Sequence, residues 1–148
     1  RSRIAACEYG GDKGIFGYGY TGSMVSMSNL VSNAGVVATD VTGVGTARAQ
    51  LAACSYGGDK GIFGYGVGSV SMTNLVSNVG VVATDTTGVG TGRSLLAACE
   101  YGQGKAIFGY GEGSFFSLTN LVSNVGVVAD DVTGVGTARA EQAACSYN

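Results

Sequence analysis

"LAACSYGGDKGIFGYG", residues 51–66, decides the fold of this chain. The stretch holds two short apolar segments, separated by a Gly-Gly-Asp turn and closed by a Gly-Tyr-Gly sequence. Short apolar runs between turn residues are typical of β-strands, and such glycine density disfavours a helix. The stretch therefore predicts an antiparallel hairpin with strands over 51–56 and 60–65.

The same sequence recurs at nearly regular intervals along the 148 residues. Cysteine follows Ala-Ala at positions 7, 54, 99 and 145, with spacings of 47, 45 and 46 residues. Repetition at this period indicates an architecture built from one repeated supersecondary unit. The chain, 1–148, is predicted to be a single repeat domain with units of approximately 1–47, 48–92 and 93–138. Residues 139–148 form a partial fourth copy of the first segment.

Two further strands are predicted to follow the hairpin in each unit. In the second unit they cover 71–78, which reads SMTNLVSN, and 81–89, which reads VVATDTTGV. Val79 and Gly80 supply the tight turn between them. Each unit is thus predicted to be all-β with four antiparallel strands, the pattern of a β-propeller blade. A fibrous β-solenoid is the main structural alternative, although its coils are usually shorter than this repeat.

Residues 45–66, GTARAQLAACSYGGDKGIFGYG, resemble the kelch repeat of β-propellers. The shared features are an arginine before an apolar first strand, a turn, and an apolar second strand that ends in a glycine doublet. The doublet takes the form Gly64-Tyr65-Gly66, and Leu75 and Val82 stand near the places where kelch blades usually carry Tyr and Trp. The resemblance covers all three units and implies kelch-like four-stranded blades, three in each chain.

The number of units predicts how the propeller is completed. Propellers typically contain about four to eight blades, and three strongly twisted sheets cannot meet in a ring. We therefore expect another copy of the chain to complete the ring, or the chain to be part of a longer array. The surplus segment 139–148 has no blade of its own in a two-copy ring, unless it frays or is exchanged between chains.

The glycines that follow the second strand resemble a dinucleotide-binding motif. The spacing Gly17-x-Gly19-x-x-Gly22 matches the fingerprint, but that site needs a helix whose N-terminus faces the pyrophosphate. The next residues, SMVSMSNLV, have a strand pattern, and the spacing fails in the other two units. We therefore expect these glycines to let the second strand leave the sheet where neighbouring blades crowd.

Composition excludes several kinds of function. The net charge is −2, and 12% of residues are charged against about 25% in typical soluble domains. This balance predicts neither a nucleic-acid partner nor an anionic membrane surface. No apolar run approaches the ~18 residues of a membrane helix. Because the chain has no histidine, Ser-His-Asp and Cys-His sites are excluded, and we predict neither an enzyme nor a cofactor.

The four cysteines are predicted to be free thiols in the first, innermost strand of each unit. Four cysteines can also form disulfides or bind a metal, but no Cys-x-x-Cys spacing and no histidine is present, so no metal site is predicted. A disulfide between equivalent strands would require a break in the symmetry of the blades.

The three units differ from one another mainly in two places. Between IFGYG and NLVSN they read YTGSMVSMS, VGSVSMT and EGSFFSLT, and a second variable cluster, 49–51, 94–96 and 140–142, follows the repeated arginine. In a four-stranded blade both variable segments emerge on one face, and the constant turns emerge on the other. Loops on a rigid scaffold usually carry recognition, so this face is the predicted ligand site.

The predicted ligand contacts come from this variable face and its rim. They are Tyr20, Met24, Glu112, Phe115 and Phe116, with Arg48, Arg93 and Arg139 at the rim. For the three arginines the alternative is a structural role, in which they pair with Asp or with carbonyl groups between blades.

Two functions from different classes fit these observations. The first is a binding module that presents its variable loops to a protein, peptide or glycan. The second is a structural scaffold that assembles with itself into an oligomer or filament. NLVSNVGVVA is uncharged and strand-prone, and such a segment can pair between chains. An enzyme is a distant third, because no convergent acid–base set is visible.

Overall fold

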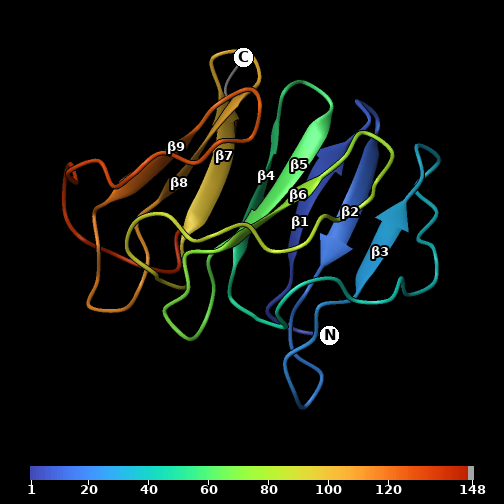
Figure 1. The fold of residues 1–148 in the computed structure, drawn as a ribbon, viewed down its shortest axis with the longest axis horizontal. Coiled ribbons are helices and arrows are strands. Elements are labelled where there is room, and N and C mark those ends of the chain that lie inside the picture. The colour runs from blue at the N-terminus through green and yellow to red at the C-terminus, as the bar shows by residue number, and fades with distance from the viewer. Residues whose placement is uncertain (147–148) are drawn as a thin grey trace.

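The computed structural model describes residues 1–146 and contains nine β-strands and no helix within them. The strands are β1 (Ala5–Tyr9), β2 (Lys13–Gly17), β3 (Ser28–Val31), β4 (Ala52–Tyr56), β5 (Lys60–Gly64), β6 (Thr73–Val76), β7 (Ala97–Tyr101), β8 (Lys105–Gly109) and β9 (Thr119–Val122). They form three antiparallel sheets, one per unit, which lie side by side (Figure 1). The all-β class and the repeat organisation are confirmed. Accordingly, no helix that could cross a membrane is present in 1–146.

The three sheets share one register. In the second unit, Cys54 pairs with Ile62, and Ile62 pairs in turn with Leu75. The equivalent residues pair in the same way in the first and third sheets. The hairpin turn requires positive φ, and Gly57 and Gly58 adopt φ of 65° and 81°, which glycine tolerates without strain. Near-identical sequence thus gives near-identical sheets.

The prediction of a fourth strand in each unit is wrong. Instead of a strand over 81–89, the second unit has two isolated bridges, Val76 with Val82 and Thr73 with Thr86. The cause is the buried Asn74 side chain, whose Nδ2 donates 3.0 Å to the Ala83 carbonyl and 2.9 Å to Asp85 Oδ1. One backbone carbonyl of this segment, that of Ala83, is therefore bonded to a side chain and not to a neighbouring strand, and each sheet has three strands.

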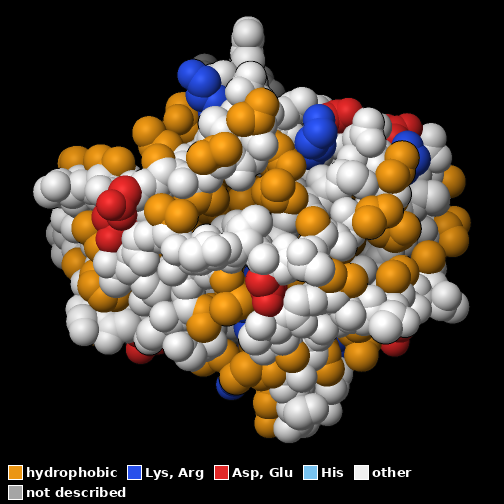
Figure 2. Space-filling model, viewed as in Figure 1, with side chains coloured by type: hydrophobic (Ala, Val, Ile, Leu, Met, Phe, Trp, Pro, Cys, Tyr) orange, Lys and Arg blue, Asp and Glu red, His pale blue; other side chains and the backbone are white. Residues whose placement is uncertain are grey.

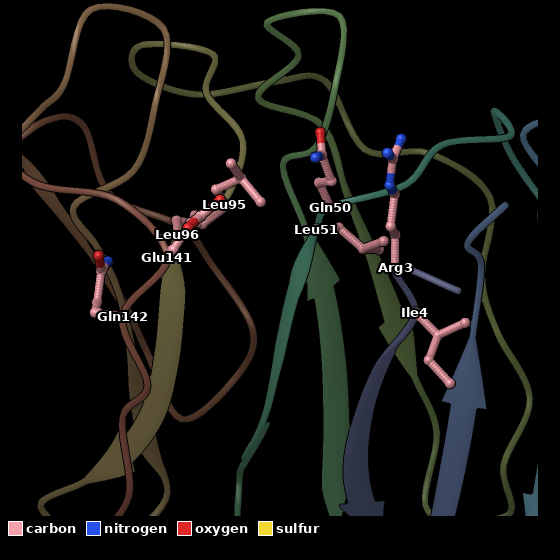
Figure 3. A pocket seen from close by; sticks show the side chains of 8 residues that line it. All are labelled: Arg3, Ile4, Gln50, Leu51, Leu95, Leu96, Glu141 and Gln142. Carbon is pink, nitrogen blue, oxygen red and sulfur yellow. The ribbon is translucent and has the colours of Figure 1, made fainter. Parts of the chain in front are cut away.

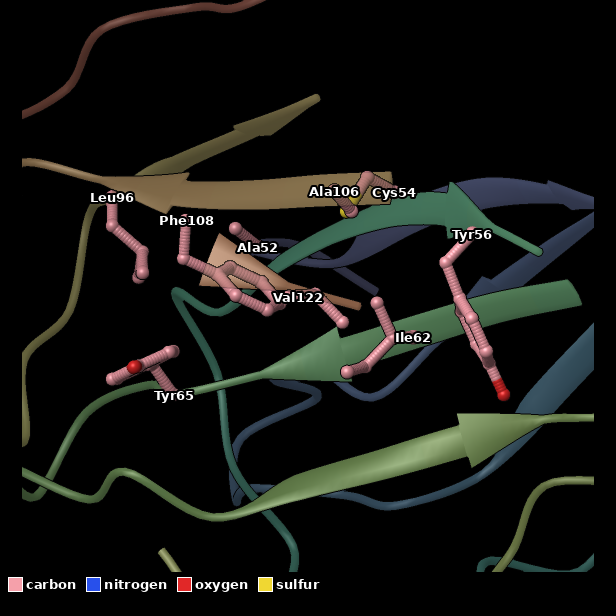
Figure 4. Close-up of a cluster of buried hydrophobic side chains, with 9 residues drawn as sticks. All are labelled: Ala52, Cys54, Tyr56, Ile62, Tyr65, Leu96, Ala106, Phe108 and Val122. Carbon is pink, nitrogen blue, oxygen red and sulfur yellow. The ribbon is translucent and has the colours of Figure 1, made fainter. Parts of the chain in front are cut away.

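The hydrophobic core lies between sheets rather than within them. Strands β1 and β4, and likewise β4 and β7, lie against each other. Figure 4 shows Phe108 and Val122 meeting Tyr65 and Ile62 between the second and third sheets. A second cluster of the same kind joins the first and second sheets. Because each unit buries its apolar face only against a neighbour, the sheets stabilise one another.

One contact defines each junction between sheets, and it explains the glycine that ends the second strand. A Cβ atom built on Gly17 would lie 2.6 Å from Cζ of Phe63, so only glycine leaves room for that ring. Phe63 also meets the Tyr18 ring edge-to-face, with centroids 5.3 Å apart. Gly64, Phe108 and Tyr65 repeat the arrangement at the second junction. After Gly22 the chain continues into β3, and not into a helix.

Candidate functional site

The two variable clusters of the sequence meet at one end of the sheets. Tyr20 and Ser2 exchange backbone hydrogen bonds of 2.9 and 3.0 Å, which join the first β2–β3 loop to the segment before β1. Glu112 and Ser94 do the same in the third unit, with bonds of 2.7 and 3.0 Å. We call this surface the variable end. It consists of the loops 20–27, 67–72 and 112–118 and the segments 3–4, 49–51, 94–96 and 140–142.

The constant turns gather separately from the variable end. The Gly10 N–H donates 2.7 Å to the Asp59 carbonyl, and the Gly57 N–H donates 2.7 Å to the Gly104 carbonyl, so turns of successive units bind each other. Asn78, from the turn after β6, donates to the Asp59 carboxylate at 3.0 Å. The variable segments therefore contact one another at one place, and the constant turns contact one another at another.

A cavity of about 480 Å³ lies in the variable end, where the four copies of the first segment come together. The copies are joined by a backbone ladder in which Gln50 N–H donates to Arg3 O at 3.1 Å and Leu95 N–H to Gln50 O at 3.0 Å. Glu141 N–H continues the ladder to Leu95 O at 3.0 Å. From right to left, Figure 3 shows the lining residues in pairs from the successive copies: Arg3 and Ile4, Gln50 and Leu51, Leu95 and Leu96, and Glu141 and Gln142.

All four ladder residues hold a left-handed backbone. Arg3, Gln50, Leu95 and Glu141 have φ of 56°, 56°, 53° and 60°. This conformation costs a residue with a side chain of order 1–3 kcal/mol, and strained residues gather at functional sites. Ten of the described non-glycine residues have positive φ, and these four are the ones among them whose side chains line the cavity.

The chemistry of the cavity changes from one end of the ladder to the other. Arg3 places a cation at one end, with its guanidinium 5.6 Å from the centre of the Tyr20 ring. Glu141 places a carboxylate at the other end, and Leu95 and Leu96 lie beside it. The cavity can therefore contact an elongated ligand that has an apolar middle and an opposite charge at each end.

The five loop residues predicted as contacts lie at or near this surface. Tyr20, Met24 and Phe115 are among the exposed large hydrophobic side chains, and Glu112 is exposed as well. Phe116 is half-buried, and its N–H donates 2.9 Å to the Gly111 carbonyl. Sequence reasoning missed Arg3 and Ile4, although aligning the segment Arg1–Gly10 with 48–57 would have placed them beside Gln50 and Leu51.

Arg48 lies inside the protein, with 1% of its surface exposed, and it acts between sheets. Its guanidinium stacks 4.4 Å from the centre of the Tyr18 ring of the first unit. It donates to the Tyr65 carbonyl at 2.9 Å and to Asn74 Oδ1, and lies 3.5 Å from Asp85, all in the second unit. Burial raises the pKa of Asp85, but hydrogen bonds from Thr46 and Asn74 outweigh it, so the pKa is lowered and the carboxylate stays charged.

Arg93 repeats this arrangement, and Arg139 forms only half of it. Arg93 is fully buried between the Tyr65 ring, at 4.4 Å, and Asn120 Oδ1, at 2.8 Å. Arg139 is exposed and stacks 3.8 Å from the Tyr110 ring, but among the described residues it has no asparagine partner. For Arg48 and Arg93, the contacts are those of the structural alternative left open by the sequence, and no surface remains for a ligand.

Cys7, Cys54 and Cys99 lie in the first strands β1, β4 and β7, whereas Cys145 belongs to no strand, so its predicted place in a first strand is wrong; all four are free thiols. Burial raises the pKa of the Cys7 thiol to about 12, and burial also raises the pKa of Cys54. Cys99 is half-buried, and Cys145 is exposed. A thiol with a raised pKa is a poor nucleophile and a poor metal ligand.

Reduction should leave the melting temperature unchanged, because no disulfide contributes to stability. Losing a disulfide from a small domain typically costs about 2–5 kcal/mol, which thermal melting with and without dithiothreitol would detect easily. With an aromatic disulfide reagent at about pH 8, Cys145 should react first and Cys54 last. A lower melting temperature in dithiothreitol would contradict the placement of the thiols.

The described residues offer no evident place for a metal ion. Within 1–146 no three Cys, Asp or Glu side chains come close enough together to hold one. No protein-family model matches the chain, and no curated protein is significantly similar to it.

Proposed function

We propose that the chain is a non-enzymatic binding module, a kelch-like β-propeller unit that presents its variable end to a protein, peptide or glycan. The observation that carries this proposal is the meeting of both variable clusters around one cavity, apart from the constant turns. A rigid sheet scaffold with variable loops at one end is the usual arrangement of a recognition surface. Sheets that pack through their first strands, as blades do, support the propeller.

The composition of the variable end favours an extended peptide among these ligands. Leu51, Leu95 and Leu96 give the cavity an apolar floor, and exposed Tyr20 and Phe115 add the aromatic surface that binding sites favour. Among the described residues that line the cavity, the titratable side chains are Arg3 and Glu141, at opposite ends of the ladder. Two groups so placed can orient a charged ligand but do not form an acid–base pair, which supports a non-enzymatic role.

Two probe libraries test this proposal: a phage-displayed random peptide library and a glycan array, both screened against the intact chain. The test variant replaces Tyr20, Leu95 and Phe115 with serine, and the control replaces the exposed Val79 and Val125 of the constant turns with serine. We expect selected ligands to lose about tenfold or more in affinity for the test variant, since aromatic contacts dominate many interfaces. The control should bind like the natural sequence.

Two outcomes would overturn the proposal. One is a set of ligands that the test variant, shown to be folded by circular dichroism, still binds with undiminished affinity. The other is loss of binding in the constant-turn control alone, which would move the site to the opposite turns.

A structural scaffold is the second candidate function, and one observation favours it. Phe16 is 37% exposed, whereas the equivalent Phe63 and Phe108 are 0% exposed because each packs on the preceding unit. An exposed copy of a core side chain is a site for association. The loops 20–27, 67–72 and 112–118 of the variable end are distinct from the exposed Phe16, whereas the segment 140–142 lies beside both surfaces, since Gln142 lines both cavities.

A further inference from the structure

We propose that two copies of this chain associate head to tail, with the first unit of one copy docked on the third unit of another. The contact would reproduce the junction that occurs twice within the chain. Its occupant is a second copy, because the two surfaces are the two halves of one junction. This inference goes beyond the proposed function, since it does not involve a ligand at the variable end.

The leading half of the junction lies on the first unit. Phe16 occupies the position of Phe63 and Phe108 but has no preceding sheet to pack on. Gly35 is equivalent to Gly80, whose face is covered by the Tyr9 ring at 3.0 Å. Within the described residues nothing lies within 4 Å of a Cβ atom built on Gly35. The first unit therefore has a phenylalanine ring, Phe16, that packs on no sheet, and a glycine, Gly35, that no ring covers among the described residues.

The trailing half lies on the third unit. A Cβ atom built on Gly109 would meet only Cγ2 of Thr119, at 3.5 Å, among the described residues. Tyr110 has no aromatic ring packed on its edge there, unlike Tyr18 and Tyr65. Tyr101 is 37% exposed, whereas the equivalent Tyr9 and Tyr56, each of which covers a glycine of the next unit, are nearly buried. Gly109, Tyr101 and Tyr110 therefore lack, among the described residues, the contacts that their equivalents make with the following sheet.

A cavity marks the place that the incoming ring would fill. It has a volume of about 360 Å³ and lies between β7, β8 and the segment after Arg139. Its lining includes Ala97, Ile107, Gly109 and Tyr110, the counterparts of core residues around Phe63 at the first junction. On the face drawn in Figure 2, hydrophobic side chains reach the surface among few charged ones. We assign this cavity to Phe16 of the second copy.

The polar contacts of the junction are also split between the two ends of the chain: the acceptor lies on the first unit and the donor on the third. Inside the chain, the backbone N–H and hydroxyl of Thr46 donate to Asp85 at 2.9 and 2.7 Å, beside Gly45. In the first unit the equivalent Asp40 accepts from Asn29 at 2.8 Å, but no threonine in 1–146 donates to it. In the third unit, Thr137 and Gly136 have no aspartate beside them among the described residues.

Arg1 completes the match between the two ends. It binds Asn29 Oδ1, as Arg48 binds the equivalent Asn74, and it donates 2.8 Å to the Met27 carbonyl. It has no equivalent of the Tyr18 ring to stack on, because that ring belongs to a preceding unit. Docking would place Arg1 over Tyr110 of the other copy and Asp40 beside Thr137.

The surplus segment after Arg139 has to give way when the second copy docks. The segment after Arg139 and strand β1 of the incoming copy would occupy the same position beside β7. Strand β1 pairs with β2 at five residues, whereas 140–146 belong to no strand and 143–146 are exposed. The segment is the weaker of the two, so β1 displaces it, and Arg1 replaces Arg139 on the Tyr110 ring. A contact of this kind is heterologous and leads to a ring or a filament.

Sedimentation velocity on the intact 148-residue chain over a range of concentrations tests the inference. We expect the natural sequence to form species at multiples of its 14.7 kDa mass. Gly109→Ala should remain monomeric, because the added methyl group fits the free chain but collides with the incoming ring, as the 2.6 Å contact at Gly17 shows. Phe16→Ala should also remain monomeric. Phe115→Ala, which removes an exposed ring outside the junction, is the matched control and should associate normally.

An equimolar mixture of the two monomeric variants gives the sharper result. Phe16→Ala keeps an intact trailing half, and Gly109→Ala keeps an intact leading half, so the mixture should form dimers and nothing larger. Unchanged circular dichroism spectra establish that both variants are folded. The inference fails if the natural sequence stays monomeric at all concentrations, if either variant associates like it, or if the mixture does not form dimers.

Discussion

Phe63→Ala should lower the free energy of unfolding by about 3–5 kcal/mol, whereas Phe16→Ala should change it by less than about 1 kcal/mol. The two rings belong to the same repeated sequence, IFGYG, and differ in what they touch. Phe63 fills the seat above Gly17 and meets the Tyr18 ring, so its removal leaves a cavity between two sheets. Phe16 is exposed, so its removal leaves none.

Urea unfolding followed by fluorescence measures both values. The Gly109→Ala background is used throughout, so that loss of association does not add to the cost of Phe16→Ala. Phe108→Ala should match Phe63→Ala, because Phe108 sits on Gly64 in the same way. Similar costs at positions 16 and 63 would contradict the assignment of the junctions.

Arg93→Ala should also lower the free energy of unfolding by about 3–5 kcal/mol, because it breaks a buried charged network. The Tyr110 carbonyl and Asn120 Oδ1 would lose their donors, at 2.6 and 2.8 Å, and Asp131 would lose its cation. Arg93→Lys should recover only part of the loss, because an ammonium group cannot reproduce the planar fork of donors.

Arg139→Ala is the matched control for the arginine experiment. Arg139 stacks on a tyrosine as Arg93 does, but it is exposed, and such a contact contributes about 0.5–1 kcal/mol. Thermal and urea unfolding of the two variants should therefore differ by several kcal/mol. Equal losses would show that the stacking on tyrosine, and not the buried network, stabilises the junction.

The sequence alone predicted the parts of the fold that depend on local signals. The period, the glycine turns and the short apolar runs placed the hairpins within about a residue, with β4 and β5 at 52–56 and 60–64. The prediction of a strand over 81–89 was wrong, although the segment has an alternating pattern typical of strands. Asn74, which lies outside the segment, binds the Ala83 carbonyl through its side chain. No local pattern carries that information.

The junction and the site depended on contacts that one sequence does not reveal. The residues IFGYG are the same in every unit, so nothing in them tells that Phe63 is buried and Phe16 exposed. The variable clusters were visible by comparing units, but the left-handed backbone that directs Arg3 and Glu141 into one cavity was not. The kelch relationship and the closed propeller stay predictions, because ring closure involves contacts beyond this chain.

The same junction joins the first unit to the second and the second to the third, while the third unit, among the described residues, keeps an unpaired half of it. Amide hydrogen exchange measured by NMR tests this claim most directly. Gly10, Gly57 and Gly102 follow the same tyrosine in their units, and the first two donate to the next unit at 2.7 Å. Within 1–146 no acceptor for the Gly102 N–H is present. In the monomeric Gly109→Ala variant, we expect Gly10 and Gly57 to exchange at least about tenfold more slowly than Gly102. Equal exchange at all three amides would contradict the account.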